Sequence, residues 1–524
     1  MYTFAKKLNS LICCLINSKF ARLKNRKLYI LIACFCVVKL ALAFISDFHS
    51  GFQGDELLHI QTGNHPDFGY MEFPPLIGWL AYLQNLLGST SVFVHHIFTH
   101  LAALAIMLLL GLIIISLGGR FKAVFIVLLC VLVSPGFGRS QQLFQPVVFS
   151  QLFWVLSFYQ LLRFTLTLDK KYLLYLALSL AFGFLAKYDI VFFGVGLLSL
   201  LVFSHTRKAT LSKSLWKYIL VFLLLVSANI WWQWKHDFPV LQMFSRLYET
   251  QLDQLGPLNV IKDMVIALNP LTAPFYLAGL IYMFIAKKNR PIAVSILISI
   301  IVLALSKSKF YYFFPVLLSI LPFGGVWFEN QLKAKRKWIL YPVTFLLVVS
   351  GIVMIPFGMA VLPLDSFIKF AGIQEENGRY PVKYQEYYSP ILWDKTLLGL
   401  QTVYDSLPKS QQQSCLIWGK HYRQAGAVSL FRESYHLPKA FSYHGSFYLW
   451  APTGKMPTTV LAFTNKEAGI DFFQSFFNTV IPVKKVFDPY ADEDEDSYQT
   501  IFVCRDPKQD FDGLHEIFKS RVFE

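Results

Sequence analysis

Three motifs that would assign a chemical activity directly are absent from this sequence. It has no glycine-rich phosphate loop, no zinc-binding signature and no nucleophile elbow. Nucleotide-driven transport and the classes of hydrolase that use these motifs therefore have no support.

Cysteine is scarce, with seven residues in a chain of 524. None of them has metal-ligand spacing to a histidine. We interpret five as structural, because they lie in the N-terminal segment or within apolar runs: Cys13, Cys14, Cys34, Cys36 and Cys130. Cys415 and Cys504 lie in the polar C-terminal region, where they either form a disulfide or remain two buried thiols.

A concentrated basic stripe is also missing. The formal net charge is +16, but Lys and Arg are dispersed among many loops, unlike the surface of a nucleic-acid-binding protein. We therefore expect no nucleic-acid partner.

Hydrophobic residues, in contrast, are in excess. They make up 55% of the chain and aromatic residues 17%, which is too much for a soluble protein. The sequence predicts a polytopic α-helical membrane protein with about eleven spans, each able to cross ~30 Å of hydrocarbon. The spans are expected near residues 28–47, 96–117, 121–137, 146–165, 172–186, 189–204, 217–233, 264–286, 291–305, 311–328 and 338–357.

The basic residues predict the orientation of these spans, since exported loops are depleted in Lys and Arg. With the spans predicted above, six basic clusters fall on the same side of the membrane: 22–27, 120–122, 170–171, 207–217, 287–290 and 333–337. We expect this side to be cytoplasmic. The N-terminus is then inside an inner (plasma) membrane, and the C-terminal region is periplasmic or extracellular.

Three parts of the chain follow from this topology. Residues 1–27 form a cytoplasmic basic amphipathic tail, residues 28–357 a transmembrane domain with an outer loop at 48–95, and residues 358–524 an exported soluble α/β domain. Within the last part, short apolar runs predict strands and longer amphipathic patterns predict helices. The strands are Cys415–Trp418, Thr459–Phe463 and Thr500–Val503, and the helices are Trp393–Leu407, Gln424–Tyr435 and Glu467–Phe477.

Carboxylates in the first outer loop are candidates for acid/base chemistry. Asp55 and Glu56 follow the first span closely, and Glu72 precedes Pro75, which begins a surface helix in this interpretation. A partly desolvated carboxylate at the membrane edge acts as a general base or holds a cation. An isolated acidic pair in a solvated loop is the competing interpretation, and Glu72 facing back toward Asp55 argues against it.

Outward-facing cations oppose the charge bias of the loops. Lys187 interrupts a long apolar stretch at an outer turn, Lys307 and Lys309 follow another span, and Lys39 lies near the outer end of the first. Lysine side chains that snorkel to the interface are the alternative for any one of them. Several such cations on the same face as the carboxylates predict a phosphate site beside an acid/base site.

These residues carry a family resemblance. The chain resembles a bacterial glycosyltransferase of the GT-C fold, in the dolichyl-phosphate-mannose protein mannosyltransferase-like family, which is similar to the aminoarabinose transferase of lipid A. The motifs in order are Gly54-Asp55-Glu56, Tyr70-x-Glu72-x-Pro74-Pro75-Leu76, Leu185-Ala186-Lys187-Tyr188, Phe238-Pro239, Asn269-Pro270, Lys309-x-Tyr311-Tyr312-x-x-Pro315, Tyr422–Ala427 and Ser442–Trp450.

The resemblance implies transfer of a sugar from a polyprenyl-phosphate donor to a protein, lipopolysaccharide or cell-envelope glycan on the outer face. It makes Asp55 the expected base, with Glu56 and Glu72 as further catalytic candidates. The donor phosphate is then expected at Lys187, Lys307, Lys309, Tyr311, Tyr312 and Lys39. Acceptor or sugar contacts are expected at Tyr70, His236, Asp237, Arg246 and His444.

No soluble cofactor is expected, because a lipid phosphate is already a competent leaving group. The requirement for a divalent cation is left open, since Gly138–Ser150 lacks the acid often found there, unless Glu72, Asp237 or Glu249 replaces it. Two other classes remain as alternatives. One is a transporter or flippase of lipid-linked sugars, although such proteins place charges near the bilayer midplane and show repeats. The other is an inactive relative that acts as a binding protein.

Overall fold

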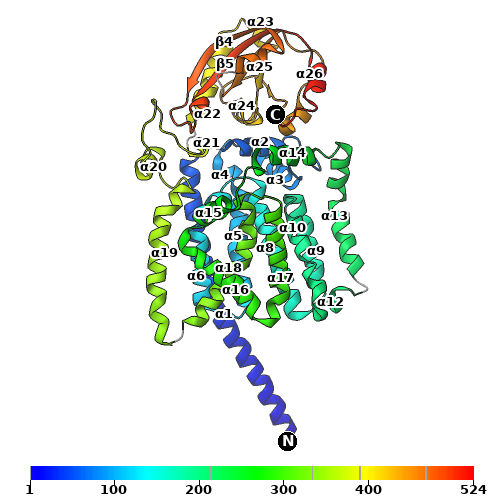
Figure 1. The fold of residues 1–524 in the computed structure, drawn as a ribbon, viewed down its shortest axis with the longest axis vertical. Coiled ribbons are helices and arrows are strands. Elements are labelled where there is room, and N and C mark those ends of the chain that lie inside the picture. The colour runs from blue at the N-terminus through cyan, green and yellow to red at the C-terminus, as the bar shows by residue number, and fades with distance from the viewer. Residues whose placement is uncertain (1, 213–214, 333, 389–390, 466–468) are drawn as a thin grey trace.

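A computed structural model shows a helical body that carries a small α/β domain at one end, with the N-terminus at the opposite end (Figure 1). It describes residues 2–212, 215–332, 334–388, 391–465 and 469–524. The body contains α1 (Tyr2–His49), α5 (Ile97–Ser116), α6 (Phe121–Leu132), α8 (Pro146–Thr167), α9 (Lys171–Ala186), α10 (Ile190–Gly196), α11 (Ser199–Val202), α12 (Ser204–Thr210), α13 (Leu215–Lys235), α15 (Pro257–Ala267), α16 (Ala273–Ile285), α17 (Arg290–Leu305), α18 (Phe314–Gln331) and α19 (Leu340–Met354).

Seven helices within the described residues are long and apolar enough to cross a membrane, or up to nine if each of two bent pairs forms one span. Two further apolar helices, Phe121–Leu132 and Lys171–Ala186, are shorter. Each predicted run overlaps one of these helices or pairs. The multi-pass class is confirmed, and the number of crossings stays a prediction.

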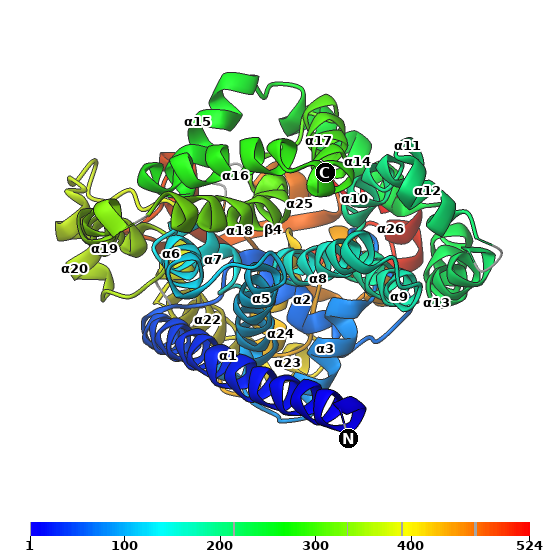
Figure 2. The same cartoon turned by 90° about the horizontal axis from the view of Figure 1, so that it is seen from below.

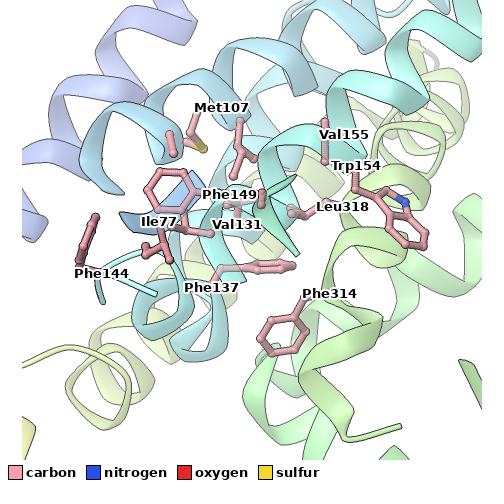
Figure 3. Close-up of a cluster of buried hydrophobic side chains, with 14 of the residues drawn as sticks. Ile77, Met107, Val131, Phe137, Phe144, Phe149, Trp154, Val155, Phe314 and Leu318 are labelled. Carbon is pink, nitrogen blue, oxygen red and sulfur yellow. The ribbon is translucent and has the colours of Figure 1, made fainter. Parts of the chain in front are cut away.

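Large apolar side chains from α5, α6, α8 and α18 pack in the interior of the body (Figure 3). These four helices lie next to one another when the body is seen from below (Figure 2). Trp154, Phe137 and Phe314 are fully or almost fully buried. Close backbone contact between α16 and α18 depends on Gly324, where an added Cβ would lie 2.0 Å from the Phe275 carbonyl oxygen. Small residues at such crossings allow membrane helices to approach each other closely.

Short helices cover the end of the body next to the C-terminal domain. They are α2 (Gly54–Thr62), α3 (Leu76–Asn85), α4 (Val92–His95), α7 (Pro135–Ser140) and α14 (Pro239–Leu247). Pro75 is the N-cap of α3, so a helix begins where the sequence predicts one. These elements form the platform on which the C-terminal domain rests.

The C-terminal domain is a five-stranded mixed sheet flanked by helices, with strand order β2-β1-β3-β5-β4. Strand β1 pairs in parallel with β2 and β3, while β5 is antiparallel to β3 and β4. The strands are β1 (Leu416–Gly419), β2 (Ala440–Phe441), β3 (Thr459–Thr464), β4 (Phe477–Phe487) and β5 (Tyr498–Pro507). The helices are α20 (Leu364–Ala371), α21 (Gln385–Tyr388), α22 (Ile391–Asp405), α23 (Lys409–Gln412), α24 (Tyr422–Phe431), α25 (Gly469–Gln474) and α26 (Phe511–Phe518).

One detail of the predicted domain needs correction, and the structure decides between two alternatives for another. The helix expected to run to Phe477 ends at Gln474, because Phe477 begins β4 and pairs with Pro507; residues 466–468 of that prediction lie outside the described part. Cys415 and Cys504 are both free and buried, so the alternative of two separate thiols holds.

The domain packs directly on the short helices at its end of the body. An added Cβ on Gly426 of α24 would lie 2.9 Å from the Leu57 side chain of α2, so the two helices touch. His65 stacks on Trp450 with ring centroids 4.4 Å apart, and the Met71 amide donates to Ser446 Oγ. The contact brings residues of the domain over one end of the helical body.

Candidate functional site

A cavity of about 1100 Å³ lies where the C-terminal domain meets the membrane body. Its walls come from five regions of the chain: the loop that contains Asp55 and Glu72, the start of α8, the turn between α9 and α10, the segment from α14 to α18, and the domain itself. Asp55, Glu72, Lys187, Lys309, Tyr311, Tyr312, Arg246 and His444 all line it. The structure thus brings eight of the predicted site residues into one space.

Asp55 lies in the first turn of α2. A capping box begins this helix, because the Gln53 side chain accepts the Asp55 amide and the Glu56 carboxylate accepts the Gln53 amide. The positive end of the helix dipole favours a negative charge at this position. Tyr422 Oη of the C-terminal domain donates to Asp55 Oδ1 over 2.6 Å, so the two parts of the protein meet at this carboxylate.

Glu72 is held by a turn of the C-terminal domain. The Ser446 amide donates to Glu72 Oε1 over 2.8 Å, and Ser446 Oγ donates to Oε2. Gly445 has φ +60°, and an added Cβ would lie 1.9 Å from Glu72 Oε1, so only glycine fits there. The pKa of Glu72 is raised to about 7, mainly by burial and to a smaller extent by the nearby Asp55. The hydrogen bonds from Ser446 act in the opposite direction.

This shift predicts a pH dependence of stability. The folded-state pKa of about 7 lies above the ordinary value of 4.5, so folding takes up a proton between these values and stability falls as pH rises through this window. We expect Glu72→Gln, which mimics the protonated acid, to remove this decline of about 3 kcal/mol. Thermal unfolding of both proteins from pH 4.5 to 8 measures it; parallel curves would contradict the prediction.

A cationic wall faces Asp55. Lys187 is the C-cap of α9, its Nζ lies 3.1 Å from Asp189 Oδ2, and it also lies 3.7 Å from the centre of the Tyr312 ring. Burial opposes the charge on Lys187, but Asp189 and Tyr312 outweigh it and raise its pKa. The lysine therefore stays charged beneath the cavity.

Lys309 adds a second cation to this wall, and its Nζ donates to Gln251 Oε1. Burial lowers its pKa, Asp55 opposes that effect, and Lys187 adds to it. An anion between the two ammonium groups would relieve their repulsion. Arg246 of α14 also lines the cavity.

Two stacked histidines of the C-terminal domain, His421 and His444, line the cavity. We call this pair the histidine roof. The rings of His421 and His444 lie 4.1 Å apart at 29°. Burial lowers the pKa of His444 to about 4, and it lowers that of His421 well below 6.5. Both imidazoles are therefore neutral near pH 7, and the roof offers flat rings and hydrogen bonds without added positive charge.

Three predicted residues lie behind the cavity wall and do not line it. Lys39 is 3% exposed and its Nζ contacts the Phe137 carbonyl oxygen, because it faces α7 inside the body. Glu56 is fully buried and caps α2 from behind. The Tyr70 hydroxyl donates to the Thr62 and His65 carbonyl oxygens, so it stabilises the outer loop. Their predicted direct roles do not fit these positions.

Three others also fall outside the cavity lining. Lys307 is ion-paired with Asp253. The His236 ring stacks on Trp232 with centroids 4.0 Å apart, which fixes it at the end of α13. Asp237 forms the turn to α14 with φ +59°. Direct contact of these side chains with substrate is not supported.

Several lining residues have no local sequence signal that points to the cavity. Tyr422 lies in a motif of the C-terminal region, but 367 residues separate it from Asp55. Asp189 and Gln145 were also missed; Asp189 pairs with Lys187, and Gln145 Nε2 donates to Gln53 Oε1. Only the fold shows that these residues meet.

Comparisons with known proteins indicate which protein family and which fold the chain resembles. The family model of dolichyl-phosphate-mannose-protein mannosyltransferase matches residues 72–232, which include Glu72, Gln145 and Lys187. No curated protein matches the chain. Two crystal structures of ArnT from Cupriavidus metallidurans are similar over 90% of this chain and 97% of theirs. The complex with undecaprenyl phosphate has 12% sequence identity to this chain and a TM-score of 0.54. The apo form has 14% sequence identity and a TM-score of 0.56.

The chain shares the fold of these ArnT structures, and residues 72–232 match the mannosyltransferase family model. The predicted resemblance and fold class are thereby confirmed. The part of the chain that matches the family model contributes Lys187 and Glu72 to the cavity, whereas Asp55, Lys309 and Tyr422 come from outside it.

Proposed function

We propose that this protein is a membrane glycosyltransferase that moves a hexosyl or pentosyl group from a polyprenyl-phosphate donor to a hydroxyl acceptor. The observation that carries the proposal is that one cavity holds the Asp55 carboxylate opposite the Lys187 and Lys309 ammonium groups. A general base and a phosphate site are the two parts that such a transfer needs. The ArnT relative with undecaprenyl phosphate supports a lipid phosphate as the donor's carrier.

In the proposed reaction, the donor phosphate binds Lys187 and Lys309, with Arg246 also in the cavity lining. The acceptor oxygen attacks the anomeric carbon as its proton passes to Asp55. The bond from that carbon to the phosphate oxygen breaks, and the ammonium groups stabilise the charge on the departing lipid phosphate. The products are the glycosylated acceptor and the polyprenyl phosphate. This scheme uses no nucleotide or other soluble cofactor, and the need for a divalent cation is left to experiment.

The acceptor is proposed to enter beneath the histidine roof. His421 and His444 present neutral rings beside Glu72 and Asp55, and flat aromatic faces suit sugar rings. Protein, lipopolysaccharide and cell-envelope glycan are the acceptor classes we propose.

We also propose that the cavity opens on the outer side of an inner membrane. The N-terminus and the basic α12 lie at the end of the body opposite the C-terminal domain (Figure 1). The positive-inside rule then places the domain and cavity outside.

The direct test uses purified protein in lipid nanodiscs with radiolabelled polyprenyl-phosphate sugars and a native membrane extract. Label that moves to an acceptor supports the proposal and identifies the donor. Donor binding or translocation without transfer would contradict it and favour a transporter.

The contact from Tyr422 yields a further prediction. Tyr422→Phe removes only the hydroxyl that donates to Asp55, and a hydrogen bond to a charged group contributes about 1.5–3 kcal/mol. We expect kcat to fall roughly tenfold with donor binding unchanged. Tyr435→Phe is the matched control, since it removes a hydroxyl that donates to Asp394 on the exposed surface. Equal activity of the two variants would contradict a role for Tyr422.

A further inference from the structure

Directly behind Asp55 lies a buried chain of charged groups that the proposed reaction does not use. His96 Nδ1 lies 2.6 Å from Asp47 Oδ1, and His96 Nε2 lies 2.7 Å from Glu56 Oε1. The side chains of all three are completely buried. They join the outer end of α1, the start of α5 and the first turn of α2.

Glu56 connects this chain to the site. Its Oε1 also accepts the Phe144 amide over 2.7 Å, and its Oε2 accepts the Gln53 amide over 2.9 Å. Gln53 Oε1 in turn accepts the Asp55 amide and the Gln145 side chain. The backbone that carries Asp55 is therefore fixed through Glu56.

The geometry defines the charge on His96. Each ring nitrogen faces a carboxylate oxygen, and only the imidazolium form donates from both nitrogens. Burial opposes this charge, but the carboxylates of Glu56 and Asp47 outweigh it and raise the pKa of His96. His100 Nε2 and Gln142 Nε2 also contact Asp47, so its carboxylate is fully engaged.

A metal ion is the other occupant to consider, because ligand atoms of Asp47, His96 and His100 lie within 4.8 Å of one another. Ligands about 2.0–2.1 Å from a tetrahedral zinc ion are roughly 3.3 Å apart. The nitrogen-to-oxygen distances of 2.6 and 2.7 Å here are instead those of charge-assisted hydrogen bonds. The geometry favours the imidazolium.

We propose that His96, charged between Asp47 and Glu56, is a positioning residue that fixes the first turn of α2 and so directs Asp55 at the acceptor. This inference rests on the proposed role of Asp55. It assigns a function to Glu56 as the link between His96 and that turn.

The test is amide hydrogen exchange, followed by mass spectrometry, on wild type and His96→Gln in nanodiscs. Gln cannot donate in two opposite directions as the imidazolium does. We expect segments 53–58 and 141–147 to exchange about tenfold faster, with α18 unchanged. His95→Gln is the control, because His95 is its buried neighbour but contacts the Ser89 carbonyl oxygen instead.

A transfer assay then separates positioning from general stability. We expect kcat of His96→Gln to fall at least tenfold while the KM for donor stays within twofold. If His96→Gln does not fold, Asp47→Asn is the second test variant, because it keeps the shape of the side chain. The same result is expected for it. Unchanged exchange in the two segments, or one equivalent of bound metal by elemental analysis, would overturn the proposal. The exchange measurement needs no turnover, so its outcome is independent of whether the proposed transfer is correct.

Discussion

Asp55→Asn is expected to abolish sugar transfer and to leave folding and donor binding intact. Asparagine has the same shape, and its amide oxygen still accepts the Tyr422 hydroxyl, but it cannot take the acceptor proton. General-base catalysis typically contributes 10²–10⁴-fold, so we expect kcat to fall about 10³-fold. Transfer in nanodiscs and binding of polyprenyl phosphate measure the two effects separately.

Asp67→Asn is the matched control for this experiment. Asp67 belongs to the same outer loop, and its carboxylate accepts the Phe68 amide outside the cavity lining. We expect this variant to transfer sugar at the wild-type rate. Wild-type activity of Asp55→Asn would refute the assigned base.

The second large effect is expected for Lys187→Ala. This change removes a charge beneath the proposed phosphate site and leaves Asp189, now without its ion pair, to repel the anionic donor. Breaking a largely buried charge interaction costs about 2–3 kcal/mol in this setting, which corresponds to roughly 30- to 150-fold weaker donor binding. The Kd for polyprenyl phosphate and the KM for donor measure it.

Lys307→Ala provides the comparison, because Lys307 pairs with Asp253 outside the cavity lining. A change of less than twofold is expected. If Lys187→Ala and Lys307→Ala weakened donor binding equally, the loss would reflect net charge, and Lys187 would have no specific phosphate role.

The sequence was informative where the physical signal is local. Apolar runs mark the membrane helices directly, and cations that interrupt them, such as Lys187, stand out against the charge bias of the loops. The same approach failed for Lys39. Its helix is apolar on nearly all sides, so the pattern does not show that Lys39 faces α7 in the interior of the body.

Contacts between distant segments could not be predicted. Nothing near Tyr422 indicates that its hydroxyl meets Asp55, because that contact depends on how α24 packs on α2. Strand β4 was missed for a related reason: it contains Pro482 and two lysines, and its pairing is irregular between Pro482 and Lys484. Its place is determined by pairing with β5 along most of its length.

The 367 residues between Asp55 and Tyr422 impose an order on biogenesis. Chains are synthesised at about 5–20 residues per second, so the carboxylate emerges roughly 20 to 70 seconds before the tyrosine that covers it. During that interval the nascent protein has the cavity residues of the helical body but not the residues of the C-terminal domain that cover them. The proposed site is therefore completed late, once the C-terminal domain has folded and docked on α2.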